Sequence, residues 1–133
     1  TLITGTAGNT GTQSLAVAIR KIGLHEEEQS FWKVLVQEGA TGLGIGLISG
    51  GMVFGIVSLW HGSIVLGAII GFAMFASIFV AALTGTCIPF ALEKFNFDPS
   101  IASGPFITTV NDLTSVLVYF TIVSQFISVY LAK

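Results

Sequence analysis

Charged side chains are scarce in this sequence of 133 residues. Only 9% of the residues are charged, whereas 53% are hydrophobic, and the mean hydropathy is +0.88. Because about a quarter of the residues in a soluble domain are charged, this composition excludes a protein that meets water on every side. The formal net charge of −2 is also too small to indicate a nucleic-acid partner.

Cysteine is reduced to one residue, Cys87, which lies within an apolar run. A single cysteine excludes an intrachain disulfide and a cysteine–histidine metal cluster. We expect Cys87 to behave as a small buried hydrophobic residue. The sequence also shows no nucleophile paired with a base, no phosphate-binding loop and no metal triad, so we do not expect an enzyme.

The sequence has no initiator methionine and no signal-peptide pattern. It opens with TLITGTAGNTGTQ, which is already half apolar. We interpret the chain as a piece of a longer protein that begins inside a membrane segment.

Long apolar segments are what the sequence does contain, at residues 34–59, 64–92 and 101–131. About 20 apolar residues are needed to span a bilayer, so each segment is predicted to be a membrane helix. Residues 1–19 become helix-like from Gln13 and are predicted to be part of another one. The predicted fold class is therefore all-α, a polytopic membrane helix bundle of about four helices with the first one partial.

Glycines recur at every fourth position in the first long segment, at Gly42, Gly46 and Gly50. Small residues at this spacing let the backbone of a neighbouring helix approach closely. The turn around Gly62 is short, so the segments on either side of it are predicted to be antiparallel neighbours.

The few basic residues predict the orientation in the membrane. Arg20, Lys21 and Lys33 flank the first connection, Lys94 lies in the third, and Lys133 alone lies on the other side. Cytoplasmic loops carry an excess of lysine and arginine. We therefore expect a multi-pass protein of the plasma membrane with its first and third connections in the cytoplasm.

The first connection also contains His25 and three consecutive glutamates, residues 26–28. Such a cluster can bind a cation loosely, but a run of charges is more often a solvated face.

Two prolines lie within the predicted spans. Pro89 is expected to bend its helix, and Pro105 is expected to free the carbonyl group of Ile101 for another partner.

One acidic residue, Asp112, lies inside the last apolar segment. A carboxylate at membrane depth is costly, and a functional role is the default interpretation. No basic residue lies well inside any predicted span, so the counter-charge is expected to be a proton or a mobile cation. The alternative is a hydrogen bond to a neighbouring helix that only stabilises packing.

Polar residues surround Asp112 at helical spacing. Thr108, Asp112 and Ser115 share a predicted helix face, Asn111 borders it, and Asp98 lies toward the cytoplasmic end. Ligands of this kind are hard oxygen donors, which suit Mg²⁺, Ca²⁺ or Mn²⁺ better than zinc or copper. These donors do not discriminate among the three divalent ions, and they do not exclude Na⁺ or H⁺.

Three stretches of the sequence resemble the membrane domain of the MgtE magnesium channels, a family related to animal magnesium carriers. They are GNTGTQSLAVAIR (residues 8–20), PFALEKFNFDPSIASGP (89–105) and TTVNDLTSVLVYF (108–120). The resemblance implies a five-helix homodimeric domain in a lipid bilayer, with the ion pathway at the two-fold axis. Residues 1–133 would form this MgtE-like pore domain without its first helix and without the cytoplasmic N-domain and CBS regulatory domains.

The resemblance also implies roles for individual residues. Asp112 matches the aspartate of the ion-selective site, where the carboxylates of two subunits hold a hydrated Mg²⁺. Thr108 matches a position whose backbone carbonyl lines the pore, and Gly8 and Asn9 fall in a helix motif that lines the same region. Asp98 matches an acidic residue near the cytoplasmic mouth.

Three functional hypotheses follow. The first is a Mg²⁺-selective channel or transporter pore, with Mn²⁺ or Ca²⁺ as further candidate ions. The second is a carrier that couples Mg²⁺ movement to Na⁺ or H⁺. The third is a membrane dimerisation module that conducts nothing, which fits the glycine spacing but leaves Asp112 unexplained.

Overall fold

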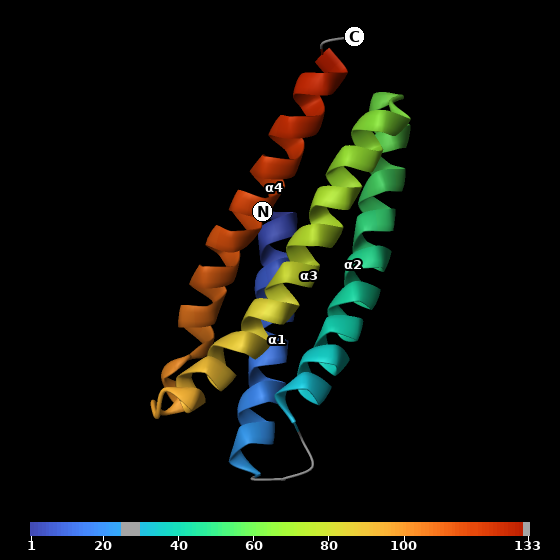
Figure 1. Cartoon of the computed structure of the whole chain (residues 1–133). Helices are drawn as coiled ribbons and strands as arrows, with labels where there is room; N and C mark the ends of the chain where they lie inside the picture. Colours follow the sequence, from blue (N-terminus) through green and yellow to red (C-terminus); the bar gives the residue numbers. More distant parts are fainter. Residues whose placement is uncertain (25–29, 132–133) are drawn as a thin grey trace.

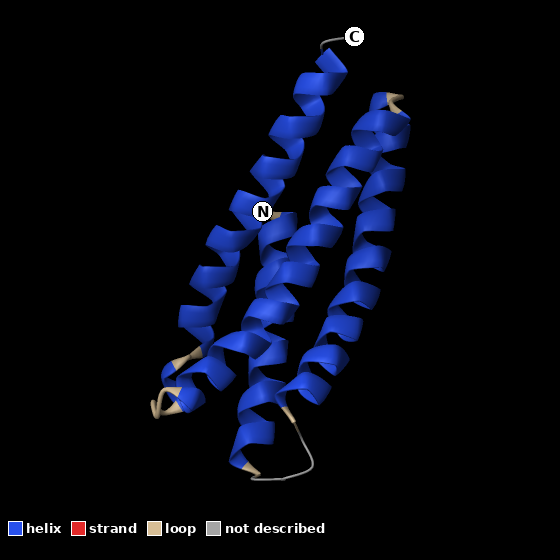
Figure 2. Cartoon of the chain, in the orientation of Figure 1, coloured by secondary structure: helices blue, strands red, loops and turns tan. Residues whose placement is uncertain are grey.

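The computed structural model describes residues 1–24 and 30–131. The elements in order are α1 (Leu2–Gly23), α2 (Phe31–His61), α3 (Ile64–Lys94), a short 3₁₀ turn η1 (Pro99–Ile101) and α4 (Gly104–Leu131). The described residues contain no strand (Figure 2). The predicted all-α class is confirmed.

Within the described part of the chain, three helices are long and apolar enough to cross a membrane, namely α2, α3 and the Gly104–Ser128 part of α4. Helices α2 and α3 have 31 residues each. At about 1.5 Å per residue, each is roughly 46 Å long, which exceeds the roughly 30 Å of a hydrocarbon core. The chain is therefore a multi-pass membrane protein, as the long apolar segments predicted.

Helix α3 lies at the centre of the bundle and packs against the other three α-helices (Figure 1). In its most apolar stretch 44% of the residues are buried, compared with 17% in α2 and in α4. A helix that is hydrophobic all round is typical of such a central position. The central helix α3 thus corresponds to the longest apolar run of the sequence that no charged residue interrupts.

Helices α2 and α3 are antiparallel and pack along the glycines that recur every fourth residue (Figure 1). A Cβ atom added to Gly50 would lie 2.6 Å from the carbonyl oxygen of Gly71, and one added to Gly46 would lie 3.1 Å from that of Phe75. Gly62 ends α2 with a φ of 64°, in the left-handed region that favours glycine. The close antiparallel pairing predicted from these glycines is confirmed.

Helix α1 packs against both α3 and α4. Its first half contributes Ala7 to a buried cluster with Met74 and Ile78 of α3. Its second half contributes Leu15 to another cluster with Ile107, next to the start of α4. The first cluster holds α1 against α3, and the second holds it against the first turns of α4, which precede Asp112.

Pro105 does not interrupt α4, contrary to the expectation of a proline inside the last span. The helix begins at Gly104, so Pro105 occupies its first turn, where a missing backbone N–H costs nothing. The carbonyl of Ile101 accepts a hydrogen bond from the backbone N–H of Ser103 at 2.7 Å and is not free for a ligand. Pro89 does lie inside a helix, and α3 continues past it to Lys94.

The connections alternate between the two ends of the bundle (Figure 1). The end of α1, the start of α2 and the α3–α4 connection lie at one end, which we call the basic end because Arg20, Lys21, Lys33 and Lys94 belong to it. The α2–α3 turn lies at the opposite end. This alternation agrees with the charge-based topology, and the cytoplasmic assignment of the basic end stays a prediction.

Candidate functional site

Asp112 lies where α4 packs against α1, and its side chain is partly exposed. A Cβ atom added to Gly8 would lie 3.0 Å from Oδ1 of Asp112 and 3.5 Å from Cγ2 of Thr108. A side chain at position 8 would therefore require the carboxylate to shift by a few tenths of an ångström. The structure thus brings Gly8, Thr108 and Asp112 together, three of the residues singled out from the sequence.

Two threonine hydroxyl groups lie close to each other in the same helix contact. The Oγ1 atoms of Thr12 and Thr108 are 3.2 Å apart across the α1–α4 contact. Each hydroxyl also bonds to a backbone carbonyl of its own helix, Thr12 to Gly8 at 2.8 Å and Thr108 to Gly104 at 2.9 Å. The α1–α4 contact therefore contains carboxylate, hydroxyl and carbonyl oxygens, which are the donor types that hard divalent cations prefer.

Asn111 adjoins Asp112 in sequence but occupies a different environment. Its side chain is 0% exposed, and neither its Oδ1 nor its Nδ2 has a hydrogen-bond partner among the described residues. A Cβ atom added to Gly11 would collide with the Asn111 carboxamide and would lie 3.1 Å from the carbonyl oxygen of Ala81. Asn111 thus lies in the packing where α1, α3 and α4 meet, whereas Asp112 reaches the surface.

Ser115 does not continue the predicted polar face to the surface. It is 1% exposed, and its hydroxyl bonds to the carbonyl of Asn111 within α4. The hydroxyl of Ser77 on α3 donates to the carbonyl of Ser115 at 3.3 Å. Ser115 therefore contributes to the α3–α4 contact.

Helix α1 presents further polar side chains outward. Asn9 is exposed, and so is Gln13, one turn further along. An amide group has no hydrogen-bonding partner in lipid, so such a face at membrane depth must be covered by protein or lined by water. No contact among the described residues brings Asn9 to Asp112, so its predicted role in the site stays a prediction.

Asp98 lies apart from Asp112, in the α3–α4 connection at the basic end. Its Oδ1 accepts hydrogen bonds from the hydroxyl of Ser100 at 2.7 Å and from the backbone N–H of Ser100 at 2.9 Å, which caps η1. These two hydrogen bonds, the hydroxyl first, hold the pKa of Asp98 below its usual value. Asp98 is therefore an exposed anion near the end of the bundle.

The described residues contain no group of three histidine, cysteine, aspartate or glutamate side chains that could hold a metal ion. A cation at Asp112 would thus need water, backbone oxygens or a second copy of the chain to complete its ligands. His25 and the glutamates at 26–28 lie outside the described residues.

Sequence reasoning missed two features of this region. Thr12 contacts Thr108, and Gly85 of α3 lies against the backbone of Gly11, so that α1 is enclosed on two sides. Both contacts join residues that are distant in sequence, so the glycines near the start of the chain were the only sequence signal for them. A further carboxylate, Glu38 of α2, is 4% exposed and was not singled out either.

Comparison with known families decides the identity. The family model for MgtE, described as a divalent cation transporter, matches residues 1–122. The chain belongs to the MgtE family. The resemblance inferred from three sequence stretches is therefore confirmed over most of the chain.

Three magnesium transporters named MgtE are similar to this MgtE chain. The protein from Enterococcus faecalis is 51% identical over 126 residues, which cover 94% of the chain. Those from Bacillus subtilis and Thermus thermophilus are 40% and 32% identical over 129 and 122 residues, covering 95% and 91% of the chain. The chain spans only 27–28% of the length of these relatives.

Proposed function

We propose that this chain forms the ion-conducting membrane part of a Mg²⁺ transporter in the plasma membrane. The observation that carries the proposal is the carboxylate of Asp112, which lies partly exposed beside Gly8 and Thr108 in a chain of the MgtE family. Relatives that are named magnesium transporters support Mg²⁺ as the ion. The oxygen donors would also accept Mn²⁺ or Ca²⁺.

A hydrated ion suits this site. Mg²⁺ sheds water reluctantly and usually keeps several of its waters when it binds protein. One chain offers a single carboxylate here, and the hydroxyl groups of Thr12 and Thr108 lie in the same α1–α4 contact. These groups would hydrogen bond to the water shell, and the carboxylate would supply the charge.

A second copy of the chain would complete the site. Two Asp112 carboxylates facing each other across a two-fold axis carry a charge of −2, which one divalent cation neutralises. The same arrangement would cover the outward-facing amides of Asn9 and Gln13. We therefore propose a homodimer in the lipid bilayer, with a further membrane helix and CBS regulatory domains in the rest of the protein.

Replacement of Asp112 by asparagine tests the proposal, because asparagine keeps the size of the side chain and removes its charge. We expect Asp112→Asn in the full-length protein to lower Mg²⁺ uptake into liposomes by at least about tenfold, because it removes the charge from both subunits of the proposed dimer and a loss of only about 1.4 kcal/mol already corresponds to tenfold. Glu93→Gln is the matched control, since Glu93 is an exposed carboxylate at the end of α3, and it should transport normally. Unchanged uptake and ion selectivity in Asp112→Asn would contradict the role given to this carboxylate.

Channel and carrier mechanisms are distinguished by electrical recording. A channel gives single-channel Mg²⁺ currents, whereas a coupled carrier gives a fixed stoichiometry between Mg²⁺ and Na⁺ or H⁺. A dimerisation module without transport would show neither, and Mg²⁺ would not stabilise the purified protein.

A further inference from the structure

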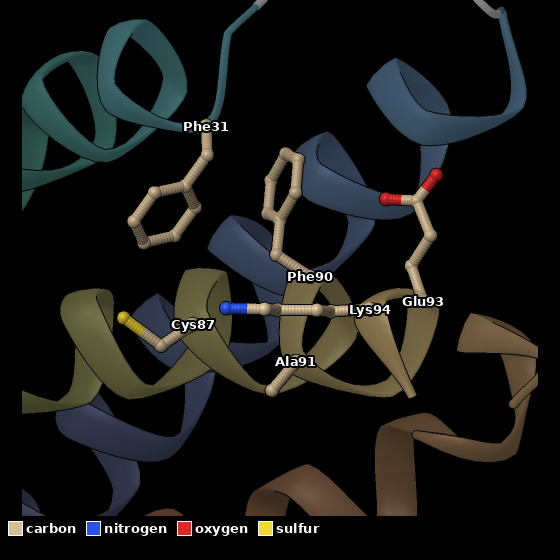
Figure 3. Close-up of a pocket in the computed structure, with 6 residues that line it drawn as sticks. All are labelled: Phe31, Cys87, Phe90, Ala91, Glu93 and Lys94. Carbon is tan, nitrogen blue, oxygen red and sulfur yellow. The ribbon is translucent and has the colours of Figure 1, made fainter. Parts of the chain in front are cut away.

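A pocket opens at the basic end of the bundle, away from Asp112, between the start of α2 and the end of α3. It has a volume of about 580 Å³, a size that is typical of small-molecule sites. Six residues line it: Phe31, Cys87, Phe90, Ala91, Glu93 and Lys94 (Figure 3).

Aromatic rings form one wall of this pocket. The rings of Phe31 and Phe90 meet edge to face with centroids 5.3 Å apart, and Phe31 makes a similar contact with Trp32 at 5.4 Å. Cys87 is half-buried beside them rather than fully buried as the sequence suggested. Aromatic rings at the end of membrane helices are typical of headgroup depth, so the pocket has an apolar body near the membrane surface.

Lys94 supplies the positive charge of the pocket. In Figure 3 its side chain extends across the opening toward Cys87, while the carboxylate of Glu93 points the other way, in the direction of α1. The neighbouring carboxylate therefore does not cover the amine. Lys94 is exposed, and a lysine that keeps its ammonium group at the polar boundary is common at membrane interfaces.

We propose that this pocket binds an anionic phospholipid of the leaflet at the basic end. The phosphate group would lie at the Lys94 ammonium, and the first carbons of an acyl chain would lie against the rings of Phe31 and Phe90. Basic pockets between membrane helices on the cytoplasmic side bind anionic headgroups, and the charge pattern predicts that this end is cytoplasmic. A soluble anion would leave the apolar wall without a partner.

Trp32 provides a direct readout, because its ring contacts Phe31. In full-length protein that keeps Trp32 as its only tryptophan, we compare quenching by brominated phosphatidylglycerol and by brominated phosphatidylcholine in mixed vesicles. We expect stronger quenching by the anionic lipid at equal mole fraction. Lys94→Gln should lower this preference about fivefold, as expected for the loss of one charge contact at the membrane surface.

The matched control is Lys33→Gln, which removes the same charge from the same end but outside the pocket lining, and it should keep the preference. Cys87→Phe fills the pocket and should reduce quenching by both lipids. Equal preference in Lys94→Gln and the parent protein would overturn the proposal. So would relief of quenching by soluble glycerol phosphate, which would indicate a site for a small anion.

Discussion

Gly8 has no Cβ atom, and this leaves room for the Asp112 carboxylate against α1. A Cβ atom at this position would lie 3.0 Å from Oδ1 of Asp112, which is tighter than ordinary van der Waals contact. The carboxylate is the end of a short side chain on a packed helix, so it would have to shift by a few tenths of an ångström. A substitution at position 8 therefore changes the geometry of the site without changing its charge.

We expect Gly8→Ala to lower Mg²⁺ uptake severalfold while Asp112 is unchanged. Gly5→Ala is the matched control, because Gly5 lies in the same helix and has nothing within 4 Å of its added Cβ atom among the described residues. Uptake of Mg²⁺ into liposomes by the two variants is the measurement. Equal uptake by both would show that the close approach at Gly8 does not position the carboxylate.

Asn111 and Gly11 form a pair that is predicted to be energetically coupled. Gly11→Ala places a methyl group where the Asn111 carboxamide lies, and overpacking of this kind costs about 1–3 kcal/mol. Asn111→Ala removes the colliding atoms together with two polar atoms that have no partner among the described residues. We therefore expect the double variant to recover much of the stability that Gly11→Ala loses.

Thermal unfolding of the purified single and double variants measures this coupling. Residues in contact have interaction energies of about 0.5–3 kcal/mol. Strictly additive effects of the two substitutions would mean that the side chains do not meet in the protein.

At the level of elements, the contact between α2 and α3 was predictable from the sequence pattern. Glycine spacing, the short turn at Gly62 and two apolar runs were enough to predict two antiparallel helices in close contact. Helix ends were less predictable. Helix α2 begins at Phe31, before the predicted span. Its first turn is aromatic and basic, which is compatible with a helix that extends beyond the bilayer.

Adjacent glycines of α2 provide a test of this contact. We expect Gly50→Ala to lower the free energy of unfolding by about 1–3 kcal/mol, because its added Cβ atom would lie 2.6 Å from the Gly71 carbonyl oxygen. Gly51→Ala should have little effect, since no described atom lies within 4 Å of its Cβ position. Thermal unfolding in detergent compares the two, and equal destabilisation would contradict the assigned faces of α2.

For the molecule as a whole, the outward-facing polar side chains of α1 are the feature that a single copy leaves unexplained. Asn9 and Gln13 lie there, and Asp112 on α4 is only partly covered. Apolar exposed residues elsewhere on the bundle need no partner other than lipid. The distribution of polarity therefore favours α1 and α4 as the surface between two copies.

Cysteine cross-linking tests that surface. In a Cys87→Ser background of the full-length protein, we expect Thr109→Cys, at an exposed position of α4 near Asp112, to form disulfide-linked dimers under mild oxidation. Phe72→Cys, at an exposed position of α3, should remain monomeric on a denaturing gel. The opposite pattern would place the dimer contact on the other side of the bundle.

Sequence alone determined the spans, their number, the excess of basic residues at one end and the unusual position of Asp112. These features are local or compositional: the bilayer requires long apolar spans of any chain that crosses it, and a carboxylate inside such a span is conspicuous because it is costly there. The family also followed from three stretches of sequence. Only the tertiary structure separated Asn111, which is buried against Gly11, from Asp112, which reaches the surface beside Gly8. Two adjacent residues on one helix point in directions about 100° apart, and the packing of helices distant in sequence decides which direction is enclosed.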